Sequence, residues 1–305
     1  MEGMNQLEIS RKLGVSKPTV SRLLKSAGQY GIVSLKVDPQ FSDCMKLQRE
    51  LMERYPIRHI YVVPLTQESQ YEYPAILKQT IAIEGARYLQ RILSEKELLG
   101  LAWGGTVHNV IRALNPCQKK NINVVTMQGD IYRCGEDYDV ETLVRRAALT
   151  FSGEKYVIKD SGFMQTPRET REKIRENYAE IFQNYYENIS ISIAGAGGWR
   201  PEIASPLSNE KSGYLTKKEQ DMLMDRGLVA DFILHMLDED GREIDSSVKD
   251  RTIAIDLDIY RKIPMKIVLL SGELKAPTAK AILSGGYADV LFLDYQLAKK
   301  LYYML

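Results

Sequence analysis

From about residue 55 onward, the chain alternates short apolar runs with stretches of helical length. Several runs are nearly continuous Val, Ile and Leu, which is typical of strands buried on both faces of a parallel sheet. Alternation of this kind over roughly 250 residues predicts a doubly wound, largely parallel α/β domain. The predicted strands are His59–Val63, Leu98–Ala102, Ile122–Met127, Lys155–Ile158, Ile189–Ala194, Thr252–Ile255, Lys266–Leu270 and Val290–Leu293. The predicted helices are Tyr73–Ile92, Asp139–Thr150 and Thr216–Arg226, preceded by a linking helix at Cys44–Arg54.

Glycine-rich segments follow four of the predicted strands. In such sheets ligands bind outside the carboxyl ends of the strands, so we expect the four segments to converge on one polar ligand. Glycines let backbone N–H groups approach an anion, and a helix N-terminus adds partial positive charge. Lys275 is the predicted cation for an anionic ligand, although a surface lysine in a helix's first turn has the same local sequence. The ligand-binding candidates from these segments are Gly104, Gly105, Thr106, Gln128, Gly129, Gly195, Gly197, Gly272 and Lys275.

The N-terminal end differs from the rest of the chain in charge. Residues 1–36 hold six Lys or Arg and two acidic residues, whereas the remainder holds 35 basic and 38 acidic residues. A small basic end on a mildly acidic body indicates a nucleic-acid-binding head, although a solvated helix face has the same charge pattern.

The order of residues within this head strengthens the interpretation. A predicted helix at Gln6–Leu13 ends at Gly14, because glycine tolerates the left-handed conformation of a tight turn. Ser16 is a good N-cap for a second helix, which Gly28 and Gly31 are expected to end. A short strand at residues 32–37 would follow.

Helix, tight turn, helix and strand together predict a winged helix-turn-helix whose second helix enters the major groove. The alternative is an ordinary helical hairpin with a charged outer face. The expected DNA-binding residues are Gln6, Ser16, Lys17, Thr19, Ser21, Arg22 and Lys25.

Several motifs, in order along nearly the whole chain, resemble those of the SorC/DeoR-type sugar-responsive bacterial transcriptional regulators. The run from Gln6 to Leu24 resembles the family's DNA-binding signature. Leu98–Thr106 is similar to its GxSWGxT segment, with Ala102 in place of the usual serine. Gly227–Asp231 is similar to its GAVGD segment, with Ala230 in place of glycine. Ser271–Lys275 begins a match to its C-terminal signature.

The resemblance implies a sugar-phosphate-isomerase-like effector domain that binds a phosphorylated sugar. It implies that Gly104–Thr106 and Lys275 help to hold the sugar phosphate, and that Asp231 contacts its hydroxyls. It also implies a homo-oligomer, a dimer or tetramer, with operator DNA as the second partner. We expect a DNA-binding head and linker helix at residues 1–52 and the effector-binding and oligomerisation domain at residues 53–305. The family usually carries another helix before the motif, so we expect either that the true start lies upstream or that this head lacks its first helix.

Other functions receive less support from the sequence. The odd, scattered cysteines and histidines argue against a local metal site and indicate a reduced cytoplasmic protein. No run approaches the roughly 20 uncharged apolar residues of a transmembrane helix, so no membrane partner is expected. We expect no cofactor and no enzyme activity. The alternatives are a sugar-phosphate isomerase with a vestigial head, for which Asp231 or Glu273 would be the base, and a regulator that senses without binding DNA.

Overall fold

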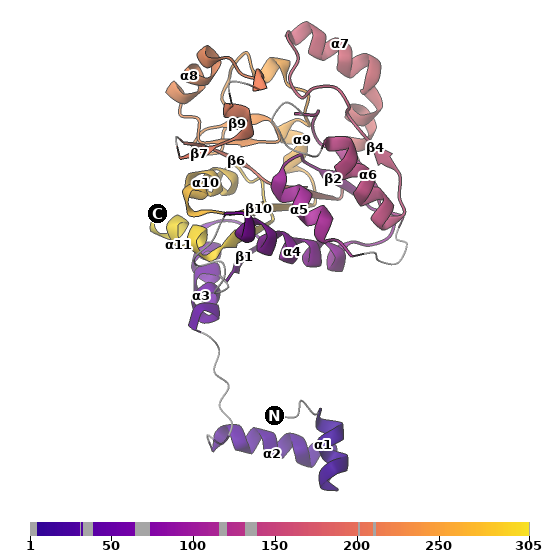
Figure 1. The fold of residues 1–305 in the computed structure, drawn as a ribbon, viewed down its shortest axis with the longest axis vertical. Coiled ribbons are helices and arrows are strands. Elements are labelled where there is room, and N and C mark those ends of the chain that lie inside the picture. Colours follow the sequence, from indigo (N-terminus) through magenta and orange to yellow (C-terminus); the bar gives the residue numbers. More distant parts are fainter. Residues whose placement is uncertain are drawn as a thin grey trace. The chain divides into compact units, whose positions relative to one another are not determined.

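The chain divides into two compact units, Met1–Ser42 and Asp43–Leu305. A computed structural model describes residues 5–30, 32, 39–64, 74–115, 121–131, 139–200, 202–209 and 212–304 (Figure 1). The division after Ser42 lies N-terminal to the boundary that we expected after residue 52. The reason is that the helix α3 (Pro39–Arg54) buries Cys44, Leu47 and Leu51 in the core of the large unit.

The small unit contains the two predicted helices, α1 (Gln6–Leu13) and α2 (Lys17–Gln29). Gly14 ends α1 in the left-handed conformation, with φ of 64°. The Ser16 hydroxyl accepts a hydrogen bond from the backbone N–H of Thr19, as an N-cap should. Gly28 does not end α2, which continues through Gln29. The predicted strand at residues 32–37 lies outside the described residues except for Ile32, so the wing stays a prediction.

A seven-stranded sheet forms the centre of the large unit, and every pair of neighbouring strands in it is parallel. Its strand order is β1-β11-β10-β5-β2-β3-β4. The continuous apolar runs are buried as predicted, because helices cover both faces of such a sheet. The strands are β1 (His59–Val63), β2 (Leu98–Leu101), β3 (Asn123–Thr126), β4 (Lys155–Tyr156), β5 (Ile191–Ala194), β10 (Met265–Leu270) and β11 (Val290–Asp294).

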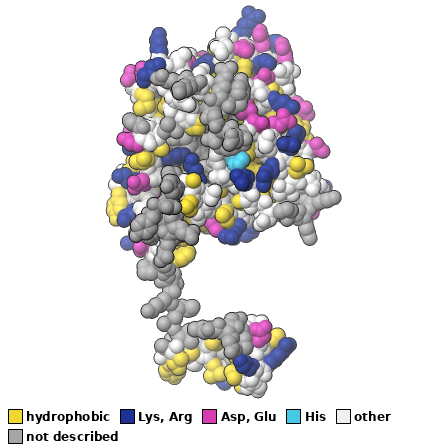
Figure 2. All heavy atoms as spheres, viewed as in Figure 1, with side chains coloured by type: hydrophobic (Ala, Val, Ile, Leu, Met, Phe, Trp, Pro, Cys, Tyr) yellow, Lys and Arg dark blue, Asp and Glu magenta, His cyan; other side chains and the backbone are white. Residues whose placement is uncertain are grey.

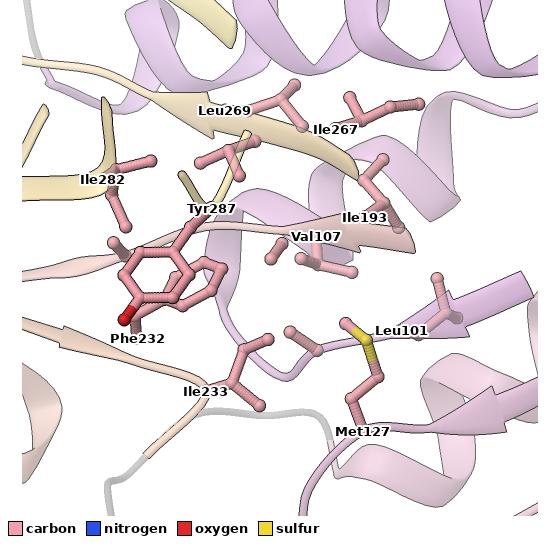
Figure 3. Packing of buried hydrophobic residues seen from close by; sticks show 14 of the residues in the cluster. Leu101, Val107, Met127, Ile193, Phe232, Ile233, Ile267, Leu269, Ile282 and Tyr287 are labelled. Atoms are coloured by element: carbon pink, nitrogen blue, oxygen red, sulfur yellow. The ribbon is translucent and has the colours of Figure 1, made fainter. Parts of the chain in front are cut away.

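Helices surround this sheet and connect its strands (Figure 1). The α-helices of the large unit after α3 are α4 (Pro74–Ile92), α5 (Gly105–Ala113), α6 (Val140–Phe151), α7 (Pro167–Asn177), α8 (Lys217–Asp225), α9 (Leu257–Arg261), α10 (Ala276–Ser284) and α11 (Tyr295–Tyr303). The described residues also form a π-helix, η3 (Ile181–Tyr185), and the short 3-10 helices η4 (Tyr186–Asn188), η5 (Pro206–Ser208), η7 (Lys249–Arg251) and η8 (Glu273–Lys275). Figure 3 shows side chains of the core between the sheet and these layers.

A second, antiparallel sheet with the order β7-β6-β8-β9 was not predicted. One of its strands, β6, begins within the glycine-rich segment after Ile189–Ala194 that the sequence analysis took for a ligand-binding loop, and Gly197 is the first residue of that strand. The predicted strand Thr252–Ile255 is wrong in turn, since this segment makes only isolated bridges to Gln128 and Phe163. The four strands are β6 (Gly197–Arg200), β7 (Ile203–Ala204), β8 (Ala230–Phe232) and β9 (His235–Leu237).

Candidate functional site

The four strands that end in glycine-rich segments are neighbours in the large sheet, in the order β10-β5-β2-β3. After β2 the chain proceeds outward through β3 and β4, and then returns to place β5 on the other side of β2. The strand order therefore reverses between β2 and β5. A topological switch point of this kind opens a crevice at the carboxyl ends of the two strands, where α/β proteins bind ligands.

A cavity of about 120 Å³ lies at these strand ends. Eight of the ten ligand-binding candidates line it, and they come from the loops after β2, β3 and β5, from the start of α5, from β6 and β8 and from η8. Gly129 and Gly272 do not line it. The lining residues are Lys78, Trp103, Gly104, Gly105, Thr106, Val107, Gln128, Ile131, Gly195, Ala196, Gly197, Ser205, Pro206, Leu207, Asp231, Ile233, Leu234 and Lys275.

The N-terminus of α5 faces this cavity. Gly104 precedes the helix with φ of 143°, a conformation that side chains rarely adopt, and provides no side-chain cap. The first N–H groups of a helix have no partners within the helix, so those of the α5 N-terminus are available to an anion. Gly195 comes from the opposite loop, and a Cβ added there would lie 3.5 Å from the Thr106 Cβ. The two loops thus approach each other across the switch point.

Two lysines give the cavity a positive end. The Lys275 ammonium donates a hydrogen bond to the Ala196 carbonyl oxygen at 2.6 Å. Burial and the nearby charge of Lys78 lower the pKa of Lys275 to about 8, while Asp231 opposes the shift. Lys78, on α4, was missed by the sequence analysis because no motif surrounds it. Two partly desolvated ammonium groups attract an anionic ligand strongly.

Asp231 supplies the carboxylate of the cavity. The Trp199 indole N–H donates to its Oδ1 at 2.8 Å, and Ser205 also bonds to the carboxylate. Burial raises the pKa of Asp231, and these hydrogen bonds counteract the shift. Gly197 pairs with Asp231 across β6 and β8, and a Cβ added to Gly197 would lie only 2.2 Å from Asp231 Oδ1. Glycine at this position therefore makes room for the carboxylate.

Gly129 and Gly272 do not line the cavity but support the backbone beside it. The Gly129 N–H donates to the Ile253 carbonyl oxygen, and a Cβ on Gly129 would lie 2.8 Å from the Gly162 Cα. Gly272 has φ of 95° and donates its N–H to Asp294 Oδ2 at 2.6 Å. Gly129 thus allows a close backbone approach, whereas Gly272 provides a left-handed backbone conformation with open space where a Cβ would lie.

An apolar wall was also missed by the sequence analysis. It contains Trp103, Ile131 and Leu207, together with Ile233 and Leu234 from the turn between β8 and β9. The cavity thus joins cationic, acidic and apolar surfaces, a combination suited to a small ligand that carries both a charge and hydroxyl or C–H groups.

The predicted DNA-binding residues lie on the small unit. Lys17, Ser21 and Lys25 are exposed at spacings of four residues, so they share one side of α2, with Arg22 exposed beside them. The hydroxyls of Ser16 and Thr19 instead bond to each other at 2.9 Å. Gln6 is half-buried on α1. In Figure 2 the small unit shows Lys and Arg beside hydrophobic side chains at its surface.

Comparison with known proteins assigns the chain to a family. Residues 39–302 match the family model described as "Putative sugar-binding domain". The chain belongs to the sugar-binding family of SorC/DeoR-type transcriptional regulators. A relative in this family, the deoxyribonucleoside regulator of Bacillus subtilis, is 26% identical over 302 residues, 97% of this chain and 92% of the relative. The sorbitol operon regulator of Klebsiella pneumoniae is 22% identical over 303 residues, 98% of this chain and 93% of the relative.

The fold agrees with that of solved members of the SorC/DeoR-type family. The crystal structure of full-length SorC from Klebsiella pneumoniae matches with a TM-score of 0.78 and 22% identity, over 98% of this chain and 94% of that one. Within the described parts of this chain, no group of three or more His, Cys, Asp or Glu is placed to hold a metal ion. None of the described helices has the length and hydropathy needed to cross a membrane.

Proposed function

We propose that this regulator binds operator DNA through α2 and that a phosphorylated sugar in the cavity of the large unit controls the binding. The observation that carries the effector assignment is the meeting of Lys275, Lys78 and the α5 N-terminus with one half-buried carboxylate, Asp231, in a single cavity. The phosphate group takes the cationic end, because helix N–H groups and ammonium groups both favour negative charge.

Asp231 accepts hydrogen bonds from sugar hydroxyls in this arrangement. Its carboxylate is held by Trp199 and Ser205, so its position is set before the ligand arrives. The family relationship to regulators named for sorbitol and deoxyribonucleosides supports a small carbohydrate as effector.

Control of DNA binding follows from linkage. An effector that binds one quaternary arrangement better than another shifts the population toward it, and only one arrangement spaces two heads to fit operator half-sites. This mechanism requires a homo-oligomer, a dimer or tetramer, and a regulator of this kind works in the cytoplasm beside the DNA.

The isomerase alternative has less support from the site. Isomerisation needs a base beside the reacting carbonyl. Glu273 is exposed and does not line the cavity, and no histidine is among the lining residues that the structure describes. Asp231 is the remaining candidate, and the hydrogen bonds to its carboxylate suit a binding role.

Calorimetric titration with pairs of phosphorylated and unphosphorylated sugars tests the effector assignment. We expect the ribose, glucose and glucosamine phosphates to include a ligand that binds at least 100-fold more tightly than its unphosphorylated partner, since two charge-assisted contacts contribute roughly 3–6 kcal/mol. Equal affinity of the chain for both members of every pair would contradict the assignment. Turnover of ribose 5-phosphate or glucosamine 6-phosphate would favour the isomerase.

A further inference from the structure

The turn between β8 and β9 adopts a backbone conformation that its residues disfavour. Ile233 has φ of 49° and Leu234 has φ of 66°, so two consecutive non-glycine residues lie in the left-handed region. A tight hairpin turn with this geometry normally contains Asn and Gly, and a β-branched residue such as Ile is rare there. Residues held in such conformations cost roughly 1–3 kcal/mol each and cluster at ligand-binding sites.

Both side chains of this turn are buried and line the effector cavity. Ile233 and Leu234 are each 3% exposed, and Figure 3 shows Ile233 among the core side chains near Phe232. Leu234 packs directly on backbone, because a Cβ added to Gly162 would lie 2.2 Å from Leu234 Cδ1. The backbones of Gly129 and Gly162 also approach each other closely. The surroundings are therefore shaped to hold this leucine.

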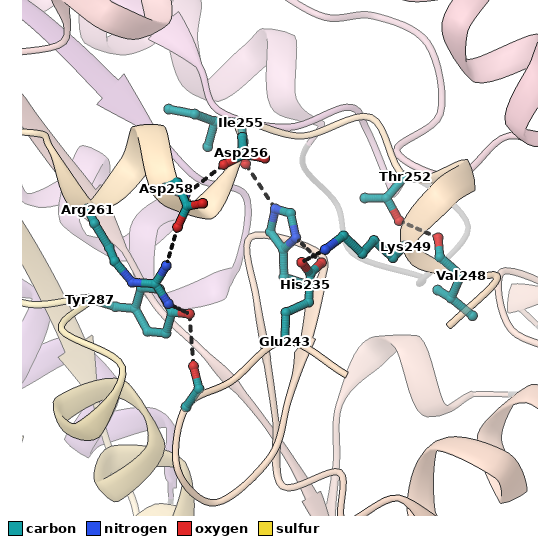
Figure 4. A network of polar contacts seen from close by, with 11 residues as sticks. His235, Glu243, Val248, Lys249, Thr252, Ile255, Asp256, Asp258, Arg261 and Tyr287 are labelled. Carbon is teal, nitrogen blue, oxygen red and sulfur yellow. Dashed lines mark hydrogen bonds and ion pairs between the residues drawn. The ribbon is translucent and has the colours of Figure 1, made fainter. Parts of the chain in front are cut away.

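A polar network fixes the strand that follows the turn. The ring nitrogens of His235 lie 2.6 Å from Glu243 Oε1 and 2.9 Å from the Ile255 carbonyl oxygen (Figure 4). Lys249 pairs with the same glutamate at 2.7 Å. The Ile255 N–H in turn donates to the Met127 carbonyl oxygen, next to Gln128 of the cavity. These contacts tie the turn to the loop after β3 and maintain the strained conformation.

We propose that the Ile233–Leu234 turn determines effector specificity by selecting a phosphorylated sugar that presents a methylene in place of a hydroxyl, a deoxy sugar phosphate. The proposal rests on the proposed function. It concerns the part of the ligand that does not contact the charged groups of the cavity. Asn or Gly would form the same turn without strain. The strained backbone is therefore retained because this position needs apolar side chains.

The chemical basis is the loss of hydrogen bonds at the turn. Ile and Leu side chains offer no partner to a hydroxyl, so a hydroxyl pressed against them loses its bonds to water without replacement. A methylene in the same place buries apolar surface instead. An apolar pocket rejects an added hydroxyl by a factor of about 100 at most. We therefore expect a preference for the deoxy ligand of about 10- to 100-fold.

Calorimetric titration of the full chain with two ligand pairs tests the proposal. The pairs are 2-deoxyribose 5-phosphate with ribose 5-phosphate, and 2-deoxyglucose 6-phosphate with glucose 6-phosphate. We expect the wild-type chain to prefer the deoxy member of at least one pair. Leu234→Asn, which tolerates the left-handed conformation and brings an amide to the wall, should reduce that preference at least fivefold. Leu234→Met, which keeps the wall apolar, should retain it.

Controls separate specificity from folding. Lys96→Asn changes another residue with positive φ, 64°, that does not line the cavity, and it should leave both affinities unchanged. Thermal melting of each variant reports whether it is folded. A wild-type preference for the hydroxylated sugars, or an unchanged preference in a folded Leu234→Asn variant, would overturn the proposal. Equal binding of phosphorylated and unphosphorylated deoxy sugars would instead contradict the proposed function, while the preference of the turn remained measurable.

Discussion

The small and large units differ sharply in how they use apolar side chains. In the small unit Val20 is 2% exposed, whereas Leu13 and Leu23 are 61% and 54% exposed. In the large unit, the leucines, isoleucines and valines of β5, β10 and β11 are almost completely buried. The large unit thus has a core that can maintain strained and desolvated groups around a cavity, while the small unit presents its polar chemistry on the surface of two helices. Substitutions in one unit should therefore leave the function of the other intact.

Removal of the half-buried cation Lys275 should give the largest effect. Lys275→Ala removes a charge-assisted contact worth roughly 1.5–3 kcal/mol, so affinity for the phosphorylated effector should fall about 10- to 150-fold. Affinity for operator DNA without effector should not change. Lys280→Ala is the matched control, because Lys280 lies on α10 and pairs with Glu239 away from the cavity. Calorimetry that finds wild-type affinity in Lys275→Ala would show that this lysine is not part of the site.

A pair of glycine substitutions probes the shape of the cavity. A Cβ on Gly197 would lie 2.2 Å from the Asp231 carboxylate, so Gly197→Ala must displace Asp231, at a cost of roughly 1–3 kcal/mol in stability and with loss of sugar discrimination. Gly195→Ala should be milder, since its Cβ would lie 3.5 Å from the Thr106 Cβ, an ordinary contact. Urea unfolding and effector titration of both variants measure the difference. Equal behaviour of the two variants would contradict the role of Gly197.

Effector affinity should also depend on pH. The pKa of Lys275 is lowered to about 8, so the free protein loses this charge as the pH rises through 8. A phosphate group with a pKa near 6 is already fully ionised there, so affinity should fall by up to about tenfold per pH unit above 8. Lys275→Met should show no such decline. A wild-type titration that is flat from pH 7 to 9.5 would argue against phosphate binding at Lys275.

The smallest effect concerns the head. Arg22→Ala should weaken operator binding by less than about tenfold and flatten its salt dependence by about one unit of slope, because one phosphate contact is lost. Glu8→Gln is a useful comparison, since this acidic residue on α1 serves the Asn5 capping box. Effector affinity should stay unchanged in both variants. Equal loss of effector binding in Arg22→Ala would show that the two units are not functionally separate.

Local signals in the sequence were sufficient for much of the fold. The helix Gln6–Leu13 and the strand His59–Val63 occur as predicted, because capping residues and continuous apolar runs act within a few positions. The antiparallel sheet was missed because Gly197–Arg200 is short and glycine-containing and gains its pairing from residues distant in the chain. Thr252–Ile255 was overpredicted, since its apolar pattern reflects burial beside Gln128 rather than strand pairing.

Much of the cavity lining could also be predicted from the sequence. A local sequence signal marks the glycines that follow strands and the lysine, Lys275, that follows the glycine-containing segment after β10. Eight of the ten candidates line the cavity. No sequence signal marks Lys78, because it comes from a helix of ordinary sequence and reaches the cavity through tertiary packing. Ile233 and Leu234 carry a misleading signal, since their residue types disfavour the left-handed turn that the structure gives them.

The linkage between the two units is tested most directly by measuring operator affinity at increasing concentrations of a phosphorylated sugar. The duplex is obtained by selection from random DNA with the full chain, and the sugar is the tightest ligand found by calorimetry. We predict that the sugar changes the operator affinity of the wild-type chain by about 5- to 150-fold, a coupling of roughly 1–3 kcal/mol, and that Lys275→Ala requires at least tenfold more sugar for the same change. A sugar phosphate that binds the wild-type chain but leaves its operator affinity unchanged would contradict the account.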